Sequence, residues 1–313
     1  MGGWSVLSFF RRTKAADSSS TSNTPVFAVN TTELVLTVPE LMTARDLNKA
    51  TRSFSAARLV GRGRNAAVYM ATLPSGAVAA AKWLETPPFG SSSTWSASDD
   101  AFLRQQVSVL STLRHDNLGR LLGYAVAPDL RVLVFEFATM GTLHDVLHAR
   151  ADRAGRGGGL QYLHEAAAVS HGGVRSTNVL LFEGLRAKIA DYDVLDQLPR
   201  DDTGCVINFG TASAYLPPEY LMTGRRIPLK CDVYSFGVVL LEILTGRASW
   251  DATMDPHGLV DWATPLLRKG GVEQWIDPKL GTHIALQCVH YYRPRSRPTM
   301  GAIARLISGI VGD

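Results

Sequence analysis

The segment 233–244 constrains the fold of this chain more than any other. Asp232 precedes it as a candidate N-cap and Gly246 follows it as a candidate helix end. Its apolar residues recur at helical spacing and leave no polar face; they are Val233, Phe236, Val239, Leu240, Ile243 and Leu244. A helix that is apolar nearly all round must be covered on every side. We therefore expect this helix in the middle of a globular lobe.

The first half of the chain has a different pattern. Residues 68–70 and 77–83 are typical of two strands joined by the turn Pro74-Ser75-Gly76, and residues 131–137 are typical of a buried strand. Between them, residues 99–113 are expected to form a helix, because Leu103, Val107, Leu110 and Leu113 fall on one face. A strand-rich first half and a helix-rich second half predict an α+β protein with two lobes.

Composition excludes several classes of protein. The 313 residues are 46% hydrophobic, which suits one large domain or two fused lobes with a real core. A net charge of +4 is small and scattered, so no nucleic-acid partner is indicated. The three cysteines, Cys205, Cys231 and Cys288, form no CxxC pair and are expected to be reduced thiols in a cytosolic protein. The longest apolar run, 233–241, is too short to cross a bilayer.

Residues 1–37 are expected to form a flexible tail. Gly2 follows Met1, as in myristoylated proteins, but Val6 stands where that signal has Ser or Thr. Apolar residues followed by basic ones could rest on a membrane surface or begin a transit peptide; they are Leu7, Phe9, Phe10, Arg11, Arg12 and Lys14. A frayed terminus is the interpretation that we favour.

A glycine-containing loop lies before the first of these strands. Gly61 and Gly63 are followed by Ala66, where a third glycine is common, and the loop returns into a strand. A dinucleotide-binding loop would open a helix instead. The tip of such a hairpin can bind phosphates through its backbone N–H groups, although by itself it is equally typical of an ordinary surface hairpin.

Later motifs together resemble the protein kinase family, in its order, over residues 54–311. They are Ala79-Ala80-Ala81-Lys82, the loop 174–181 with Asn178, Ala190-Asp191-Tyr192-Asp193, Pro217-Pro218-Glu219, the segment 232–237, and Arg297-Pro298. The segments 131–141 and 178–182 are most similar to plant receptor-like cytoplasmic kinases of the Pto-interacting kinase group. The resemblance implies a two-lobed kinase fold with a small β-rich lobe and a larger helical lobe whose helices are shortened.

The resemblance also divides the chain. Residues 38–55 are similar to the lead-in that precedes the kinase domain in that group. A kinase-like domain over 56–313 is expected to follow it, with the N-lobe at about 56–137 and the C-lobe at about 138–313.

By the same resemblance, ATP and Mg²⁺ are the implied cofactors. Lys82 would contact the α- and β-phosphates, and Asn178 and Asp191 would supply oxygen ligands for Mg²⁺. The implied ATP-binding set is Gly61, Gly63, Val68, Ala80, Lys82, the backbone of Glu136 and Phe137, and Leu180, with Phe135 behind the adenine pocket.

The resemblance fails where the family reads His-Arg-Asp, because this chain has His171-Gly172-Gly173. The family's Asp accepts the proton of the substrate hydroxyl, and Gly173 has no side chain that could do so. Gly172 also removes the arginine that holds a phosphorylated activation segment. We expect His171 to be a packed structural residue and not a substitute base. Arg175 keeps the charge of the lysine common at its position.

Other positions also depart from the kinase pattern, whereas one ion pair of the family persists. Gln106 stands where a glutamate pairs with the nucleotide lysine, and Asp193 replaces a hinge glycine. The segments 149–158 and 277–283 are shorter than the family's, which should leave part of the helix at 233–244 uncovered. Glu219 and Arg297 persist, and their family counterparts form a buried ion pair.

These observations leave three hypotheses. The first is a catalytically impaired pseudokinase that acts through binding, with other protein kinases or receptor complexes as partners. The second is an active Ser/Thr kinase that autophosphorylates, with Thr203, Thr211 and Ser213 as candidate acceptors. The third is a chain whose shortened C-lobe is unstable. The expected location is the cytoplasm, with peripheral attachment to the plasma membrane as an alternative.

Overall fold

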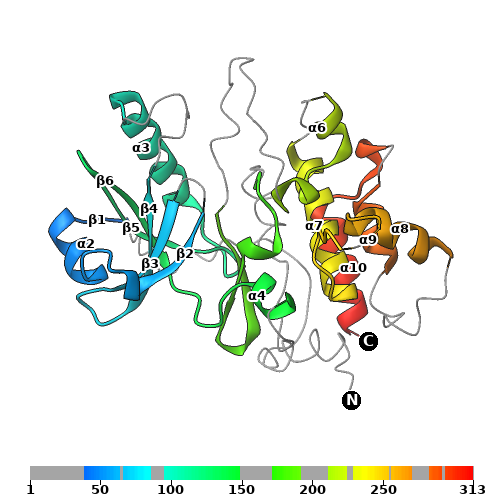
Figure 1. Cartoon of the computed structure of the whole chain (residues 1–313), viewed down its shortest axis with the longest axis horizontal. Helices are drawn as coiled ribbons and strands as arrows, with labels where there is room; N and C mark the ends of the chain where they lie inside the picture. The colour runs from blue at the N-terminus through cyan, green and yellow to red at the C-terminus, as the bar shows by residue number, and fades with distance from the viewer. Residues whose placement is uncertain are drawn as a thin grey trace, which may run out of the picture. The chain divides into compact units, whose positions relative to one another are not determined.

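The computed structural model describes residues 39–63, 66–85, 95–148, 171–191, 211–223, 228–253, 255–269, 282–290 and 293–312. These residues divide into two compact units. The N-terminal unit contains residues up to 114 and residues 119–138, and the C-terminal unit contains residues 115–118 and those from 139 onward. The first unit is built on a sheet and the second is mainly helical (Figure 1). The predicted α+β, two-lobed fold is confirmed.

The N-terminal unit contains a six-stranded sheet with the strand order β1-β5-β6-β4-β3-β2. The strands are β1 (Glu40–Leu41), β2 (Leu59–Arg62), β3 (Ala66–Thr72), β4 (Val78–Leu84), β5 (Leu121–Ala127) and β6 (Leu130–Glu136). All neighbouring pairs are antiparallel except β1 and β5, which are parallel. The strands predicted around 68–83 and 131–137 are confirmed.

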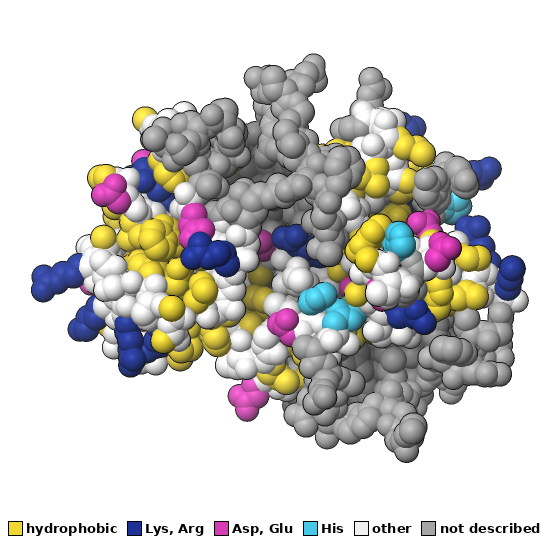
Figure 2. Space-filling view, viewed as in Figure 1, with side chains coloured by type: hydrophobic (Ala, Val, Ile, Leu, Met, Phe, Trp, Pro, Cys, Tyr) yellow, Lys and Arg dark blue, Asp and Glu magenta, His cyan; other side chains and the backbone are white. Residues whose placement is uncertain are grey.

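One face of this sheet forms a hydrophobic core. Small residues on neighbouring strands, Ala71, Ala79 and Ala81, pack here against helix α2 (Ala44–Thr51). Helix α2 begins with a capping box between Thr43 and Asp46 and buries Leu47 completely. Other apolar side chains stay at the surface of this unit, as Figure 2 shows; among them, Leu59 and Val60 of β2 are 40% and 56% exposed.

Helix α3 (Ala97–Thr112) is held to the sheet by an ion pair that the sequence did not suggest. The guanidinium of Arg131, on β6, donates to both carboxylate oxygens of Asp100 at 2.9 and 3.1 Å and lies over the ring of Trp95. Arg131 is almost fully buried, so this bidentate pair fixes the start of α3. The helix predicted over 99–113 is therefore confirmed, and it begins at Ala97 after the N-cap Ser96.

The C-terminal unit is built around helix α7. Its other elements include short 3₁₀ helices (η) and one hairpin: α4 (Leu143–His148), η2 (Ser176–Asn178), β7 (Val179–Phe182), η3 (Glu183–Leu185), β8 (Arg186–Ile189), η4 (Thr211–Tyr215), α6 (Pro218–Thr223), α7 (Pro228–Thr245), α8 (Leu259–Lys269), α9 (Thr282–Cys288), η6 (Pro294–Ser296) and α10 (Met300–Gly312). Residues 117 and 118 join the hairpin, because Ile189 donates to the carbonyl of Asn117. Figure 1 shows α8, α9 and α10 gathered around α7.

The core position predicted for the segment 233–244 is confirmed, but two details were wrong. The helix begins at Pro228, so Asp232 lies inside it and is not its N-cap. The helix is also covered over most of its length: Val238 and Leu241 are 0% exposed and Val239 is 2% exposed. Leu240 and Ile243 are half-buried. Helix α9 packs so closely here that a β-carbon on Gly237 would lie 2.6 Å from Cβ of Cys288. Gly246 ends the helix with a positive φ of 66°, as expected.

Several predictions fall outside the described residues. They concern the tail at 1–37, the shortened segment at 149–158, residues 277–281, Asp193 and Thr203. Within the described part of the chain, none of the helices has both the length and the apolar character needed to cross a bilayer.

Candidate active site

The N-terminal unit carries the residues predicted to bind a nucleotide. The β3–β4 register aligns Val68 with Lys82 and Met70 with Ala80, so Val68, Ala80 and Lys82 lie on one face of the sheet. This face is opposite to the one that packs against α2, and all three residues are half-buried. The pairing therefore brings these predicted residues together within the unit.

The glycine loop is a hairpin and not the start of a helix, as predicted. Arg62 pairs with Ala67 across the antiparallel strands β2 and β3, and the N–H of Gly63 donates to the carbonyl of Ala66 at 2.8 Å. Gly61 and Gly63 are exposed, and a β-carbon on Gly61 would meet nothing within 4 Å. Bare, exposed backbone of this kind can approach an anion closely.

The remaining predicted positions of this unit lie at the end of β6 and on α3. Glu136 pairs with Ala79, and its carboxylate accepts the N–H of Arg120 at 2.8 Å; Phe137 follows it directly. Gln106 is half-buried on α3, beside the buried Leu103 and Leu110.

The C-terminal unit carries the predicted metal ligands. The side-chain amide of Asn178 donates to the carbonyl of Gly173 at 2.8 Å, which leaves its Oδ1 as the acceptor on the other side of the amide. Asp191 lies at the end of β8 with a φ of 61°, an uncommon conformation for a residue with a side chain. Its Oδ2 is 4.0 Å from Nη2 of Arg175, and both side chains are partly exposed. Leu180, on β7, is half-buried, and its backbone forms an isolated antiparallel β-bridge with that of Thr142.

Asn178 and Asp191 meet beside Gly173. A β-carbon on Gly173 would lie 3.6 Å from Nδ2 of Asn178 and 3.8 Å from the backbone oxygen of Asp191. Carboxylate and amide oxygens are the ligands that Mg²⁺ prefers, so this pair fits that cation. The third atom within 4 Å of this β-carbon that is among its three nearest is Nδ1 of His171, at 3.8 Å. Among the residues that the structure describes, none of these three nearest atoms is a carboxylate oxygen.

His171 is a structural residue. Its side chain is fully buried; Nδ1 accepts the N–H of Gly173 at 3.1 Å, and Nε2 lies 3.1 Å from the carbonyl of Ala190, to which it donates in this tautomer. Burial lowers the pKa of His171, which keeps the ring neutral. Both ring nitrogens are therefore engaged by backbone groups, in agreement with the interpretation from the sequence.

Asp232 holds the backbone of the same loop, a role that the sequence did not reveal. Its carboxylate is buried in α7 and accepts the N–H groups of His171 at 2.6 Å and Gly172 at 2.9 Å. The signal available in the sequence was an acidic residue next to the apolar run 233–241, which needs a partner when it is buried. Gly172 has a φ of 75°, which glycine adopts without strain.

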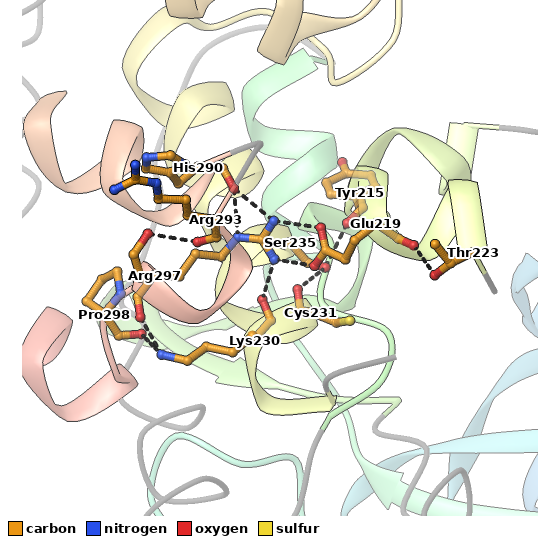
Figure 3. A network of polar contacts seen from close by, with 11 residues as sticks. Tyr215, Glu219, Thr223, Lys230, Cys231, Ser235, His290, Arg293, Arg297 and Pro298 are labelled. Atoms are coloured by element: carbon orange, nitrogen blue, oxygen red, sulfur yellow. Dashed lines mark hydrogen bonds and ion pairs between the residues drawn. The ribbon is translucent and has the colours of Figure 1, made fainter. Parts of the chain in front are cut away.

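Arg297 organises a second buried network (Figure 3). Its guanidinium donates to both carboxylate oxygens of Glu219 at 2.6 and 2.9 Å, to the carbonyl of Lys230 at 3.1 Å and to the carbonyl of His290 at 2.9 and 3.2 Å. The ammonium group of Lys230 donates in turn to the carbonyl of Arg297. The ion pair implied for Glu219 and Arg297 is therefore present and joins α6, α7 and the segment before α10.

Comparison with known proteins agrees with this architecture. The sequence model of the protein kinase domain matches residues 54–299. The chain is 40% identical to PTI1-like tyrosine-protein kinase 1 of Arabidopsis thaliana, over 89% of this chain and 84% of that protein. It is 41% identical to PTI1-like tyrosine-protein kinase 2 of the same plant, over 87% of this chain and 76% of that protein. It is also 33% identical to the receptor-like serine/threonine-protein kinase ALE2 of Arabidopsis thaliana, over 100% of this chain and 43% of that protein.

Proposed function

The chain belongs to the protein kinase family, in its plant Pto-interacting type, and we propose that it is a catalytically impaired member that acts through binding. Protein kinases generally use ATP and Mg²⁺. The proposal is that this chain keeps the residues that bind both but lacks the group that activates the acceptor hydroxyl.

The observation that carries the proposal is the glycine at residue 173. The family's aspartate at this position accepts the hydroxyl proton and orients the nucleophile, and loss of such a base costs about 10²–10⁴ in rate. The atoms nearest to the missing side chain are an amide nitrogen, a ring nitrogen and a backbone oxygen. The guanidinium of Arg175 offers only hydrogen-bond donors and cannot serve as a base.

His171 does not offer a replacement. Its Nδ1 already accepts a backbone N–H, its Nε2 lies beside the carbonyl of Ala190, and its ring is 0% exposed. To act as a base, the ring would have to leave its pocket and abandon both contacts.

ATP and Mg²⁺ binding are proposed on Lys82, Asn178 and Asp191. Bound Mg²⁺ would neutralise phosphate charge. Asn178 is held in place by its bond to Gly173, so the position of its Oδ1 is fixed before any cation binds. A thermal shift assay of the full chain with and without Mg-ATP tests this part, because a ligand that binds only the folded state raises the melting temperature. No shift at millimolar Mg-ATP would contradict it.

Phosphotransfer is tested with labelled ATP and a Gly173→Asp variant. The β-carbon fits, since its neighbours are at ordinary contact distance and residue 173 has no positive φ. We expect the wild type to match Lys82→Ala, and Gly173→Asp to gain transfer by up to about 10²–10⁴-fold. Gly173→Ala is the matched control, because it adds the β-carbon without the carboxylate. Robust transfer by the wild type that Lys82→Ala abolishes would refute the proposal.

An active kinase is the second candidate, favoured by the presence of Lys82, Asn178 and Asp191. It predicts autophosphorylation, with Thr203, Thr211 and Ser213 as candidate acceptors, and mass spectrometry of the purified chain would detect it. The relatives' names include both tyrosine and serine/threonine kinases, so the analysis should cover all three acceptor types.

Other protein kinases or receptor complexes are the proposed partners, and the cytoplasm, including its plasma membrane surface, is the proposed location. The receptor-like kinases among the relatives support this proposal. Membrane attachment can be tested by cell fractionation of the tagged wild type and its Gly2→Ala variant. Only acylation at Gly2 predicts that the variant moves from the membrane fraction to the soluble fraction.

A further inference from the structure

A cluster of metal-ligating side chains lies in the C-terminal unit and contains none of the residues assigned to ATP and Mg²⁺; the hydroxyl of Ser176, two residues before Asn178, lies 3.3 Å from Nδ1 of His144. His144 and His148 are four residues apart on α4 and share one face, with ring centroids 4.6 Å apart. Glu242, on α7, lies against them. The ligand atoms that these three residues offer all lie within 4.8 Å of one another.

The carboxylate of Glu242 is fully buried, and its charge needs compensation. Its hydrogen-bond donors include neutral groups: the hydroxyl of Tyr215 at 2.9 Å to both oxygens, the hydroxyl of Ser176 at 3.3 Å and the N–H of Ser249 at 3.2 Å. Burial and the nearby carboxylate raise the pKa of Tyr215 to about 12, so its hydroxyl stays protonated. Among these contacts of the described residues none comes from Lys or Arg, and Nε2 of His148 lies 3.3 Å from Oε1. A buried carboxylate without a cation beside it is costly.

We propose that His144, His148 and Glu242 bind a divalent zinc ion. Two histidines one helical turn apart with a carboxylate from a second helix form a ligand set that zinc accepts, with a fourth position left for water. Imidazole ligands select zinc over Mg²⁺, so this site is chemically distinct from Asn178 and Asp191. The ion replaces the hydrogen bond between His148 and Glu242 and supplies the positive charge that the buried carboxylate needs.

The surroundings support the assignment. Tyr215 and Ser249 hold the Glu242 carboxylate in place, as outer-shell partners of metal ligands do. Zinc–nitrogen distances of about 2.0–2.1 Å require tetrahedral ligand atoms about 3.3–3.5 Å apart. His148 Nε2 and Glu242 Oε1 already have that spacing, at 3.3 Å. His144 is half-buried and would close the remaining gap by a rotation of its side chain.

The test is zinc binding to the full chain after removal of metals with a chelator. Titration with zinc chloride should show one equivalent bound and a raised melting temperature, whereas magnesium chloride should not compete at this site. His144→Gln and His148→Gln should each weaken zinc binding by more than the roughly 10- to 100-fold that loss of an outer-shell partner costs. His283→Gln is the matched control, because His283 is exposed on α9 and lies outside the cluster.

A second measurement keeps the test decisive if a variant fails to fold. X-ray absorption of the zinc-loaded wild type should show nitrogen and oxygen ligands at about 2.0–2.1 Å with an imidazole signature. A sulfur shell at about 2.3 Å would overturn the proposal, because it would place zinc on cysteines. So would the absence of stoichiometric zinc binding, or binding that both histidine variants leave unchanged. These outcomes are independent of whether the chain transfers phosphate.

Discussion

Two polar networks of the C-terminal unit differ in what they retain. Around Arg297 the full set is present: the guanidinium is buried, bidentate to Glu219 and bonded to two backbone carbonyls. In the loop at 171–178 the backbone is bonded to the side chains of Asp232 and Asn178, but two of its positions are glycine. The first network keeps the side chains of the family's ion pair, whereas the second has glycine where the family has its proton-accepting aspartate.

The comparison teaches that the shape of a catalytic loop and its chemistry depend on different residues. Asp232 accepts two backbone N–H groups, so this hold on the loop does not depend on which side chains residues 172 and 173 carry. Stability in this unit should therefore be sensitive to Arg297 and insensitive to residue 173, and catalysis should show the reverse.

The largest expected effect is that of Arg297→Ala. Removing this guanidinium leaves the Glu219 carboxylate without its partner, and breaking a buried pair costs about 3–5 kcal/mol. Denaturant unfolding measures the loss. The control is Arg62→Ala, which breaks the exposed pair with Glu85 and should cost about 0–1 kcal/mol. Equal losses of unfolding free energy in the two variants would contradict the stabilising role assigned to the Arg297 network.

Alanine substitutions at two glycines, Gly237 and Gly173, separate packing from chemistry in the same unit. Gly237→Ala would place a β-carbon 2.6 Å from Cβ of Cys288 and 2.8 Å from Cγ1 of Val289, and overpacking of this kind costs about 1–3 kcal/mol. Alanine is more favourable than glycine in a helix by roughly 1 kcal/mol, and this gain offsets only part of the overpacking cost. Gly173→Ala meets its neighbours only at 3.6–3.8 Å and should change the free energy of unfolding by no more than about 0.5 kcal/mol.

The melting temperatures of the two alanine variants measure this difference. Gly237→Ala should melt below the wild type, and Gly173→Ala should stay close to it. If Gly173→Ala were the less stable variant, the loop would depend on its glycine for packing, and the separation between stability and chemistry would fail.

The smallest effect concerns pH. Burial lowers the pKa of His171 from 6.5 in the folded protein, so the unfolded chain binds a proton that the folded chain does not. The stabilisation is therefore complete above about pH 6.5 and is lost as the pH falls below it, with a slope of at most about 1.4 kcal/mol per pH unit. Denaturant unfolding between pH 8 and pH 5 measures this slope. His171→Gln should lower stability at pH 8 and flatten the slope, whereas the exposed His283→Gln should leave it unchanged.

Local patterns predicted most elements of the fold. The periodicity of Leu103, Val107 and Leu110 predicted α3, and the all-round apolar pattern after Asp232 predicted the central helix. The order of the motifs identified the family and located Glu219 and Arg297, although they are far apart in the chain. Helix starts were less certain, because Asp232 has the chemistry of an N-cap and only packing shows that its carboxylate serves another segment.

Contacts between distant residues could not be predicted in this way. No spacing rule links Arg131 to Asp100, or His144 and His148 to Glu242, because each pair of elements meets only after the unit has folded. The expected uncovering of the central helix was wrong for a similar reason: the fit of α9 against Gly237 is a property of two surfaces and not of either sequence.

By itself, the sequence determined that residue 173 is a glycine, which can neither accept a proton nor orient a hydroxyl. The tertiary structure decided which described atoms lie nearest to that position, and they are an amide nitrogen, an imidazole nitrogen and a backbone oxygen. The reason is physical: the atoms of a residue fix what it can do, but only the folded chain fixes which distant atoms lie within hydrogen-bonding distance of it.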